Sequence, residues 1–371
     1  MAYHTFMKVL VTGTHFTPAV AVIEQFGKYH EVELIYVGRK TVMEGENITS
    51  LESKILPKMR VKFIALITGR LQRAFTIYSI PSLFKIPLGL IQSFFIILTE
   101  KPDVVLSFGG YVAVPVVIIA WLFSIPIIIH EQTLVAGLAN SISSFFADKI
   151  AISFAGVHFN NKPTVLTGNP LRNEILKVNN KTLHKEKLPL ILVTGGNQGS
   201  HIINVAVESC LKELLKIACV IHQTGDSRYK DFERLTYLQN DRYIVKKFID
   251  DMGKVLSMVD VVISRSGINI LTELAYFGKP ALVIPIPYLF ADEQNKNAQF
   301  FKKLGLVKIL PQSQLSAKIL LANVKLILND LNHFKKEAKC AKAVVIPDAA
   351  KRLALETILL AGQKFKQCAK E

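Results

Sequence analysis

Short apolar segments alternate with helical stretches along the whole chain, and this alternation constrains the fold more than any other feature. The first series of predicted strands covers residues 8–13, 31–38, 103–107, 126–130 and 149–153. After a polar stretch at 173–187, a second series covers residues 190–195, 219–223, 243–246, 259–264 and 281–286. Buried strands with helical connections form parallel sheets that are covered on both faces. The sequence therefore predicts an α/β protein.

The two series predict two Rossmann-like domains. Ligands of such sheets bind at the carboxyl ends of the strands, so we expect a cleft between the domains. The length of 371 residues suits two domains. We place the first domain at residues 1–167 and the second at residues 168–346.

The charge of the chain indicates a negatively charged partner. A formal net charge of +16 and a pI of about 9.6 are typical of proteins that meet nucleic acid, an anionic membrane surface or phosphorylated substrates. The cysteines Cys210, Cys219, Cys340 and Cys368 form no C-x-x-C pair. We therefore expect reduced thiols in a cytoplasmic protein, without disulfides or a zinc site. The first residues do not form a compact signal peptide.

Two apolar segments approach the length of a membrane span. Residues 112–129 are interrupted by two prolines and a serine, which predicts a helix, a turn and a buried strand. Residues 75–98 are interrupted by two prolines and a lysine. We expect neither segment to cross a membrane.

Residues 53–99 contain no aspartate or glutamate, although large apolar side chains and seven basic residues are mixed along them. The basic residues are Lys54, Lys58, Arg60, Lys62, Arg70, Arg73 and Lys85. This mixture favours peripheral contact with an anionic membrane. The alternative is a pair of amphipathic helices with a solvated basic face. We do not expect nucleic acid as the partner, because no binding motif accompanies the charge.

The segment VLVTGTHFTPAVAV at residues 9–22 is a predicted strand that turns into a helix through Thr12, Gly13, Thr14 and His15. Such a turn binds phosphate on backbone N–H groups at the positive end of the helix dipole. A dinucleotide is not the expected ligand. The G-x-G-x-x-G pattern is absent, and the second strand ends without an acidic residue for a ribose.

A second strand-to-helix turn occurs at Arg265-Ser266-Gly267. The helix after it offers free N–H groups to a diphosphate, and Glu273 is placed to accept hydrogen bonds from ribose hydroxyls. The alternative is an ordinary helix with a serine cap and an exposed glutamate. Another glycine-rich turn, residues 195–200, also follows a strand. Together the two turns favour a nucleotide diphosphate, and without an Asp-x-Asp motif we expect no metal.

These turns belong to a longer set of landmarks whose order and spacing are specific. They are Gly109-Gly110-Tyr111, His130-Glu131-Gln132, Gly168-Asn169-Pro170 with Arg172, Gly195-Gly196 with Gln198-Gly199, Phe248-Ile249-Asp250-Asp251-Met252, Arg265-Ser266-Gly267 with Glu273, Asp292 to Ala298, and Ile346-Pro347-Asp348. Over almost the whole chain, this set resembles the MurG family of UDP-N-acetylglucosamine:undecaprenyl-diphospho-muramoyl-pentapeptide glycosyltransferases.

The resemblance implies the GT-B fold, with two Rossmann-like domains that face each other across a cleft and a last helix, residues 347–371, that returns to the first domain. It implies inverting transfer of GlcNAc from UDP-GlcNAc to the C4 hydroxyl of undecaprenyl-diphospho-MurNAc-pentapeptide, without a cofactor. The partners are then both substrates and the anionic membrane surface, and the location is the cytoplasmic face of the bacterial cell membrane.

The resemblance also assigns residues. It gives His15 the role of general base, for which a pKa near neutrality is suitable. His130 is the rival base, but we expect it to orient its neighbours. The implied substrate-binding residues are Thr12, Gly13, Thr14, Thr133, Arg172, Asn197, Ile249, Ser266, Gly267, Ile268, Asn269, Ile270, Leu271, Thr272, Glu273 and Gln294.

Several residues depart from the family pattern. Val11 and Thr14 replace glycines, and a positive φ at Thr14 would change the shape of the acceptor loop. Thr133 stands in place of asparagine, and Asn197 in place of serine. These changes leave open a related glycosyltransferase with another donor or lipid acceptor. A third hypothesis is a catalytically silent membrane-bound partner, although the retained His15, Glu273 and Gln294 argue against it.

Overall fold

The computed structural model describes residues 6–41, 50–69, 79–159, 162–178, 188–226 and 229–368. The chain forms two units. The N-terminal unit comprises Met1–Arg172 and Ile346–Glu371, and the C-terminal unit comprises Asn173–Val345. The first boundary lies a few residues after the expected position at 167, because the segment after the last strand of the first sheet remains with that sheet.

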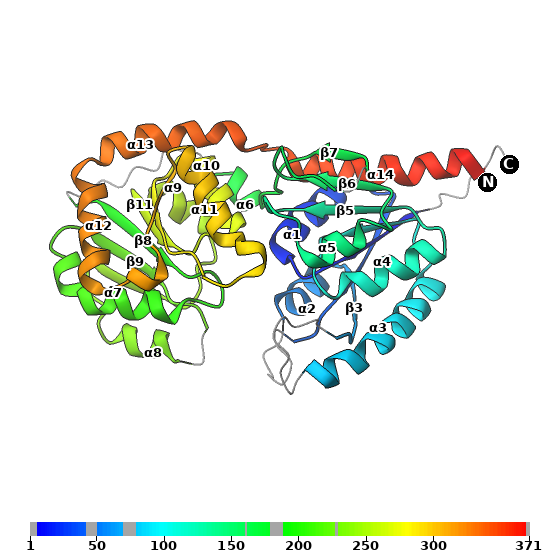
Figure 1. Ribbon diagram of the computed structural model, residues 1–371, viewed down its shortest axis with the longest axis horizontal. Coiled ribbons are helices and arrows are strands. Elements are labelled where there is room, and N and C mark those ends of the chain that lie inside the picture. The colour runs from blue at the N-terminus through cyan, green and yellow to red at the C-terminus, as the bar shows by residue number, and fades with distance from the viewer. Residues whose placement is uncertain are drawn as a thin grey trace. The chain divides into compact units, whose positions relative to one another are not determined.

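A seven-stranded parallel sheet in the order β3-β2-β1-β4-β5-β6-β7 forms the centre of the N-terminal unit (Figure 1). Its strands are β1 (Met7–Thr12), β2 (Val32–Gly38), β3 (Lys62–Ala65), β4 (Val104–Ser107), β5 (Ile127–Glu131), β6 (Lys149–Ile152) and β7 (Thr164–Leu166). Its helices are α1 (Phe16–Phe26), α2 (Leu51–Ile55), α3 (Ser79–Glu100), α4 (Ala113–Leu122), α5 (Leu138–Ser143) and α14 (Ala349–Cys368), with a short 3-10 turn η1 (Leu56–Met59).

Alternate residues of β1 point to opposite faces of this sheet and belong to two different cores. Val9 and Val11 lie in a core with buried residues of α1 and α14. Leu10 lies in the other core, with buried residues of α3 and α4. Both faces of the sheet are therefore covered, and the carboxyl ends of the strands remain for a site.

A six-stranded parallel sheet in the order β10-β9-β8-β11-β12-β13 forms the C-terminal unit. Its strands are β8 (Leu190–Thr194), β9 (Cys219–Gln223), β10 (Tyr243–Lys246), β11 (Val261–Ser264), β12 (Ala281–Val283) and β13 (Val307–Ile309). Its helices are α6 (Asn173–Leu176), α7 (His201–Leu214), α8 (Asp231–Thr236), α9 (Met252–Met258), α10 (Ile268–Phe277), α11 (Glu293–Lys303), α12 (Ala317–Asn329) and α13 (Leu331–Cys340), with 3-10 turns at Phe290–Asp292, Gln312–Gln314 and Ala341–Val344. The prediction of two parallel, Rossmann-like sheets is confirmed.

The two long apolar segments form different structures. Residues 112–129 form α4, a turn and β5, as expected. The described part of the acid-free segment contains the end of α2, η1, β3 and α3, and α3 is a single helix of 22 residues that contains Pro87. Within the described residues, no helix combines the length and apolar character needed to cross a bilayer.

Candidate active site

Two turns of the N-terminal unit contact each other at the carboxyl ends of β1 and β4. The backbone N–H of Thr14 donates to the Gly109 carbonyl at 3.0 Å. From the neighbouring strand, the buried Tyr36 hydroxyl donates to the Gly13 carbonyl, also at 3.0 Å. These bonds fix the turn between β1 and α1 in which Thr12, Gly13 and Thr14 were predicted to bind substrate.

Glycine is required on both sides of this contact. Gly13 has φ of 140°, and a Cβ there would lie 2.8 Å from the Gly109 carbonyl oxygen. Gly110 has φ of 83°, and a Cβ there would overlap the Thr14 hydroxyl. Thr14 itself is not among the residues with positive φ. The change of loop shape through Thr14 is therefore not found, because Gly13 adopts the unusual backbone angle instead.

His15 is the N-cap residue of α1, and its side chain is half-buried and makes no capping bond. Burial, together with the positive charge of Arg39, lowers the pKa of His15 to about 4. The prediction of a pKa near neutrality is wrong, because the sequence alone reveals neither the burial of this imidazole nor the position of Arg39. Near pH 7 His15 is neutral and so has a lone pair that can accept a proton.

His130 lies at the end of β5 and is only 1% exposed. Its Nε2 lies 3.2 Å from the Gly168 carbonyl and 3.1 Å from the Ser153 hydroxyl. Burial is the largest cause that lowers its pKa, to about 4, and the proximity of His15 contributes. Because the Gly168 carbonyl can only accept, Nε2 carries the proton. A buried ring fixed in this way is suited to orienting its neighbours.

The buried Glu131 carboxylate organises the loop that follows β5. Its Oε1 accepts from the backbone N–H of Thr133 at 2.9 Å, and the Thr133 hydroxyl lies at the same distance. Its Oε2 accepts from the Asn140 amide at 2.9 Å and from the Gly137 N–H at 3.1 Å. The Thr133 hydroxyl also lies 2.6 Å from the Val135 carbonyl, so it is used within the turn.

In the C-terminal unit, the turn between β11 and α10 is buried on one side and open on the other. The buried Ser266 hydroxyl donates to the Gln294 carbonyl at 2.9 Å. The Gln294 side chain accepts from the Ile286 N–H, also at 2.9 Å. Gly267 is the N-cap residue of α10, and a Cβ there would meet nothing within 4 Å. The first turn of α10 therefore begins beside open space, as a diphosphate at a helix N-terminus requires.

The predicted residues of α10 divide into two groups. Ile268, Asn269 and Ile270 form the first turn, where backbone N–H groups have no acceptor within the helix. Leu271 and Thr272 are buried, and their polar groups are used in the helix: the Leu271 N–H donates to Gly267 and the Thr272 hydroxyl to Ile268. Glu273 is in the second turn and is 4% exposed, so it is not the exposed residue of the alternative interpretation.

Comparison with known proteins covers both units. Residues 9–152 match the glycosyltransferase family 28 N-terminal domain, and residues 190–353 match the family 28 C-terminal domain. A relative from Listeria monocytogenes is 35% identical over 368 residues, which are 95% of this chain and 99% of the relative. A relative from Bacillus cytotoxicus is 34% identical over 362 residues, 94% and 97% of the two chains. Both are named UDP-N-acetylglucosamine--N-acetylmuramyl-(pentapeptide) pyrophosphoryl-undecaprenol N-acetylglucosamine transferase.

The chain belongs to the MurG family. The crystal structure of Acinetobacter baumannii MurG matches with a TM-score of 0.73 and 26% identity over 95% of this chain and 99% of that one. The glycosyltransferase of kitacinnamycin matches with a TM-score of 0.68 at 14% identity, which shows the fold alone. The GT-B fold expected from the sequence is confirmed.

The remaining predicted residues of this MurG-family chain lie in loops. Asn197 is exposed in the turn between β8 and α7, and Ile249 follows β10. Arg172 is the last residue of the N-terminal unit before α6. Neither Glu131 nor Arg39 was among the predicted site residues, although hydrogen bonding was expected of Glu131. The three polar residues His130, Glu131 and Gln132 in succession could have indicated the role of Glu131. The role of Arg39 could not be predicted, because only the folded structure brings Arg39 near His15.

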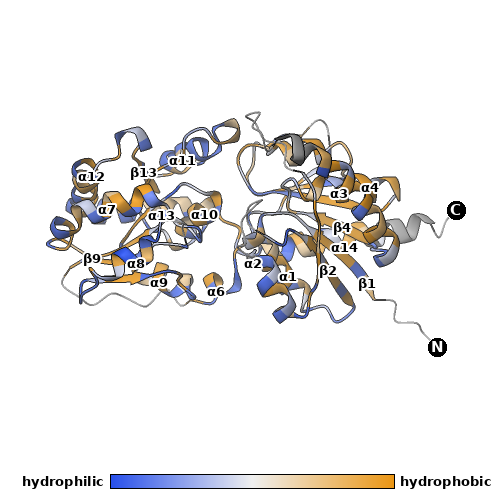
Figure 2. Ribbon diagram, turned by 90° about the horizontal axis from the view of Figure 1, so that it is seen from below, coloured by the Kyte–Doolittle hydropathy of each residue, from blue (hydrophilic) through white to orange (hydrophobic). Residues whose placement is uncertain are grey.

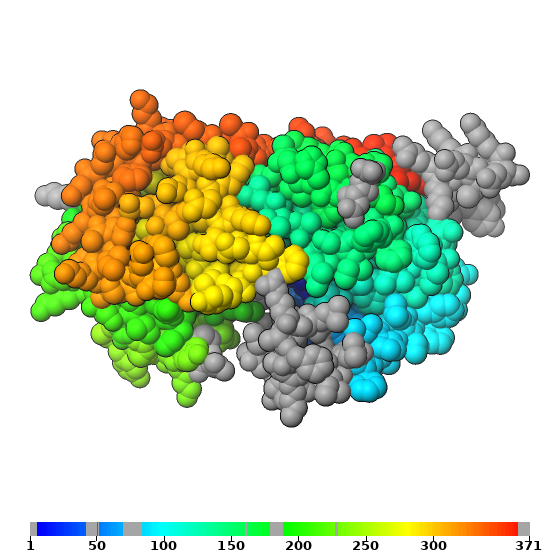
Figure 3. Space-filling view, in the orientation of Figure 1, coloured from blue at the N-terminus to red at the C-terminus, as the bar shows by residue number. Residues whose placement is uncertain are grey.

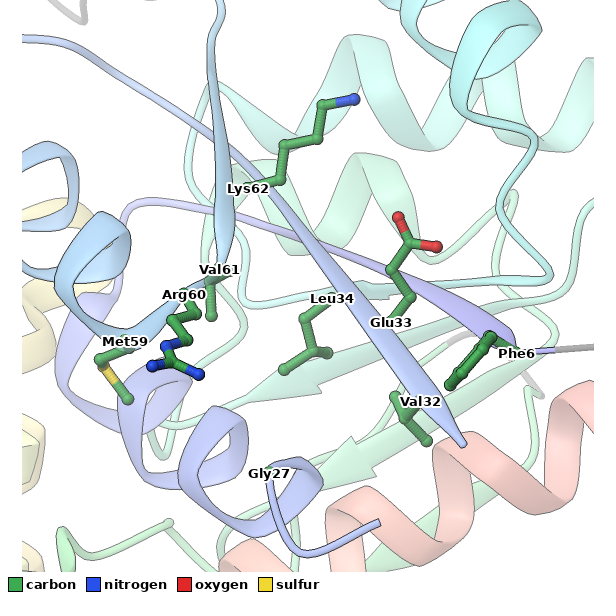
Figure 4. A pocket seen from close by; sticks show the side chains of 9 residues that line it. All are labelled: Phe6, Gly27, Val32, Glu33, Leu34, Met59, Arg60, Val61 and Lys62. Carbon is green, nitrogen blue, oxygen red and sulfur yellow. The ribbon is translucent and has the colours of Figure 1, made fainter. Parts of the chain in front are cut away.

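Other features lie away from these turns. A hollow lined by nine residues, including Val32, Arg60 and Lys62, opens beside the amino end of β2 (Figure 4), whereas the predicted acceptor turn lies at carboxyl ends. Within the described parts of the chain, no three His, Cys, Asp or Glu side chains are grouped closely enough to hold a metal ion.

Proposed function

We propose that the protein transfers GlcNAc from UDP-GlcNAc to the C4 hydroxyl of undecaprenyl-diphospho-MurNAc-pentapeptide, with inversion at the anomeric carbon. The observation that supports this most is that about one-third identity with transferases of this name extends through both units. The proposed acceptor turn and the proposed donor turn therefore both lie within the matched sequence.

The donor side uses the dipole and N–H groups of α10. The diphosphate of UDP-GlcNAc binds beside Gly267, where no side chain obstructs the first turn, and the Glu273 carboxylate accepts hydrogen bonds from the ribose. The 2.9 Å bond from Ser266 to Gln294 connects the start of α10 to the first turn of α11. When UDP leaves, the helix N-terminus stabilises its charge.

The acceptor side uses His15. Its neutral imidazole takes the proton of the C4 hydroxyl as that oxygen attacks C1 of GlcNAc from the face opposite UDP. The acceptor carries a diphosphate, and a nearby negative charge raises the pKa of an imidazole. His15 therefore becomes a stronger base when the acceptor is bound.

The identity of the sugar donor is tested by measuring the rate of transfer from UDP-GlcNAc, UDP-GalNAc and UDP-Glc to a polyprenyl-diphospho-muramoyl acceptor. Rapid transfer from UDP-GlcNAc alone is expected.

Glu273→Ala is expected to weaken UDP binding by about 1–3 kcal/mol, because charged hydrogen bonds to the ribose are lost. Calorimetry with UDP measures this change. The wild-type affinity should be the same with and without EDTA, since helix N–H groups bind the diphosphate. An affinity that disappears with EDTA would contradict this binding mode.

The N-terminal unit also carries a surface suited to a membrane. Five apolar residues at helical spacing form one exposed stripe along α3. They are Phe84, Leu88, Ile91, Phe95 and Leu98. Trp121, Leu122 and Phe123 at the end of α4 are also exposed, and the ring centroids of Phe94 and Phe123 lie 5.4 Å apart, so the stripe continues onto α4. The ribbons of α3 and α4 lie side by side and carry mainly hydrophobic residues (Figure 2), and Figure 3 shows the surface of this part of the N-terminal unit.

We propose that this membrane patch, α3 with the end of α4, binds the cytoplasmic face of the bacterial membrane, where the lipid-linked acceptor lies. A large exposed apolar area is typical of a membrane contact. Lys85 lies at the start of the patch, whereas Arg70 and Arg73 of the predicted basic set lie outside the described residues.

Replacing Ile91 and Phe95 together by glutamate is expected to reduce binding to anionic vesicles by about 100-fold or more, since each buried side chain of this size contributes about 1.5–3 kcal/mol. Vesicle sedimentation measures the loss, and rising salt should weaken wild-type binding. Tyr237→Glu, an exposed change in the C-terminal unit, is the control. Equal binding of wild type to neutral and anionic vesicles would refute the electrostatic contribution.

A further inference from the structure

A buried carboxylate in the C-terminal unit connects α7 with α8. Asp231 is the first residue of α8 and is 1% exposed. Its Oδ1 accepts from Arg234 at 2.7 Å and lies 2.8 Å from His201 Nδ1, and its Oδ2 accepts from the Asn204 amide at 2.9 Å. Several charge-assisted hydrogen bonds together hold a buried carboxylate in one position.

The same contacts extend into the sheet. The Asn204 side-chain oxygen lies 3.0 Å from His222 Nε2, and His222 Nδ1 lies 2.8 Å from the Tyr243 hydroxyl. Burial lowers the pKa of His222 to about 3, so this ring is neutral. The hydrogen-bonded series therefore runs from β10 through β9 and α7 to Asp231. Its members Asn204, His222 and Tyr243 are all buried.

This bonded series also reaches the residue that packs against the turn at residues 195–200. The Asn204 amide donates to the Thr224 carbonyl at 3.1 Å, and that carbonyl oxygen lies so close to Gly199 that a Cβ there would overlap it. The Gln223 amide donates to the Gly196 carbonyl at 3.1 Å. The turn is thus bonded to the end of β9 at Gly196 and packs against the residue after β9 at Gly199.

Polar atoms remain unused beside this turn. Among the described residues, the buried Ser200 hydroxyl and the buried Gln223 side-chain oxygen have no hydrogen-bond partner. His201, the next residue along the chain, stacks on Tyr229 at 3.9 Å with an angle of 12° between the rings. Its side chain is 38% exposed, and since Nδ1 faces the buried Asp231, the exposed edge carries Nε2.

We infer that His201, held by Asp231, is a positioning residue that keeps the turn at 195–200 in the shape that binds the nucleotide diphosphate of the donor. This inference rests on the proposed function, which puts a UDP-sugar in the C-terminal unit. The His201–Asp231 bond joins the end of the turn to the carboxylate that also binds Asn204. Loss of this bond therefore removes a contact that keeps the turn in position.

The test compares His201→Ala with His201→Asn. The alanine variant is expected to raise the Kd of UDP and the KM of UDP-GlcNAc about tenfold with kcat changed less than about twofold, because binding common to ground and transition state is lost. Asparagine offers an N–H to Asp231 and should restore most of the affinity. His333→Ala, which removes an exposed histidine 3.5 Å from Glu337 on α13, is the matched control and should match wild type.

Asp231→Asn should raise the Kd of UDP similarly, and adding His201→Ala to it should weaken binding little further, since coupled residues are not additive. If wild type binds UDP and folded His201→Ala binds it equally, the inference is wrong and the proposed function stands. An asparagine variant as weak as alanine would also overturn it, because the bond to Asp231 would then not matter. If wild type does not bind UDP, the proposed function itself fails.

Discussion

Replacing His15 by alanine is expected to lower kcat by about 10²–10⁴, the contribution of a positioned general base. His15 lies at the turn between β1 and α1, and with a pKa lowered to about 4 it is neutral at pH 7. UDP affinity should change less than about twofold, because the proposed nucleotide site is in the other unit. Steady-state kinetics with both substrates and calorimetry with UDP measure the two quantities.

The pH profile gives a second readout for His15. The base must be unprotonated, so wild-type kcat/KM is expected to fall as the pH drops through about 4, the pKa of the free enzyme. Bound acceptor phosphates raise this pKa, so kcat should begin to fall at a higher pH. His15→Ala should lack this acidic limb.

His130 is the control for the assignment. Its ring is buried, and its Nε2 is engaged by Gly168 and Ser153, so it is poorly placed to reach an acceptor hydroxyl. His130→Ala should therefore keep the acidic limb, although its rate falls. A His130→Ala enzyme without the limb, beside a His15→Ala enzyme that retains it, would reverse the assignment.

Glu131→Ala should destabilise the protein by about 3 kcal/mol or more, because each buried donor left without an acceptor costs about 1–3 kcal/mol. The affected donors are the backbone N–H groups of Thr133 and Gly137 and the Asn140 amide. Urea denaturation monitored by circular dichroism measures the free energy of unfolding.

Two variants calibrate this result. Glu131→Gln keeps one acceptor oxygen and should lose less stability than alanine. Glu213→Ala removes an exposed carboxylate that pairs with Lys216 in the C-terminal unit, and surface changes of this kind stay within about 0.5 kcal/mol. If Glu131→Ala costs no more than Glu213→Ala, Glu131 does not organise the loop.

The strands β4, β5 and β8 could be predicted because every residue in them is buried and most of these residues are apolar. Residues 219–223 and 243–246 have the predicted bounds in β9 and β10. β3, β7 and β13 were not predicted. Each is a short edge strand, and β3 and β7 contain no fully buried residue, so their sequences lack the apolar signal. α3 continues through Pro87 because packing against α4 outweighs the effect of one proline.

The turns of the site could be predicted from their glycine and serine residues and from the strand before each turn. The pKa values and ionic contacts of the site could not be predicted. The pKa of His15 depends on burial and on Arg39, which the fold brings near. The His201–Asp231 contact joins residues 30 positions apart, and the His130–Gly168 contact joins residues 38 positions apart. Such pairs depend on tertiary packing and leave no local pattern.

Inverting transfer of GlcNAc is tested by the anomeric configuration of the product. Wild-type protein is incubated with UDP-GlcNAc and a polyprenyl-diphospho-MurNAc-pentapeptide, and the isolated product is examined by proton NMR. Because the hydroxyl attacks from the face opposite UDP, we expect a β-linked GlcNAc on the C4 oxygen of the muramoyl sugar. An α-linked product, or no transfer under conditions in which UDP binds, would contradict it.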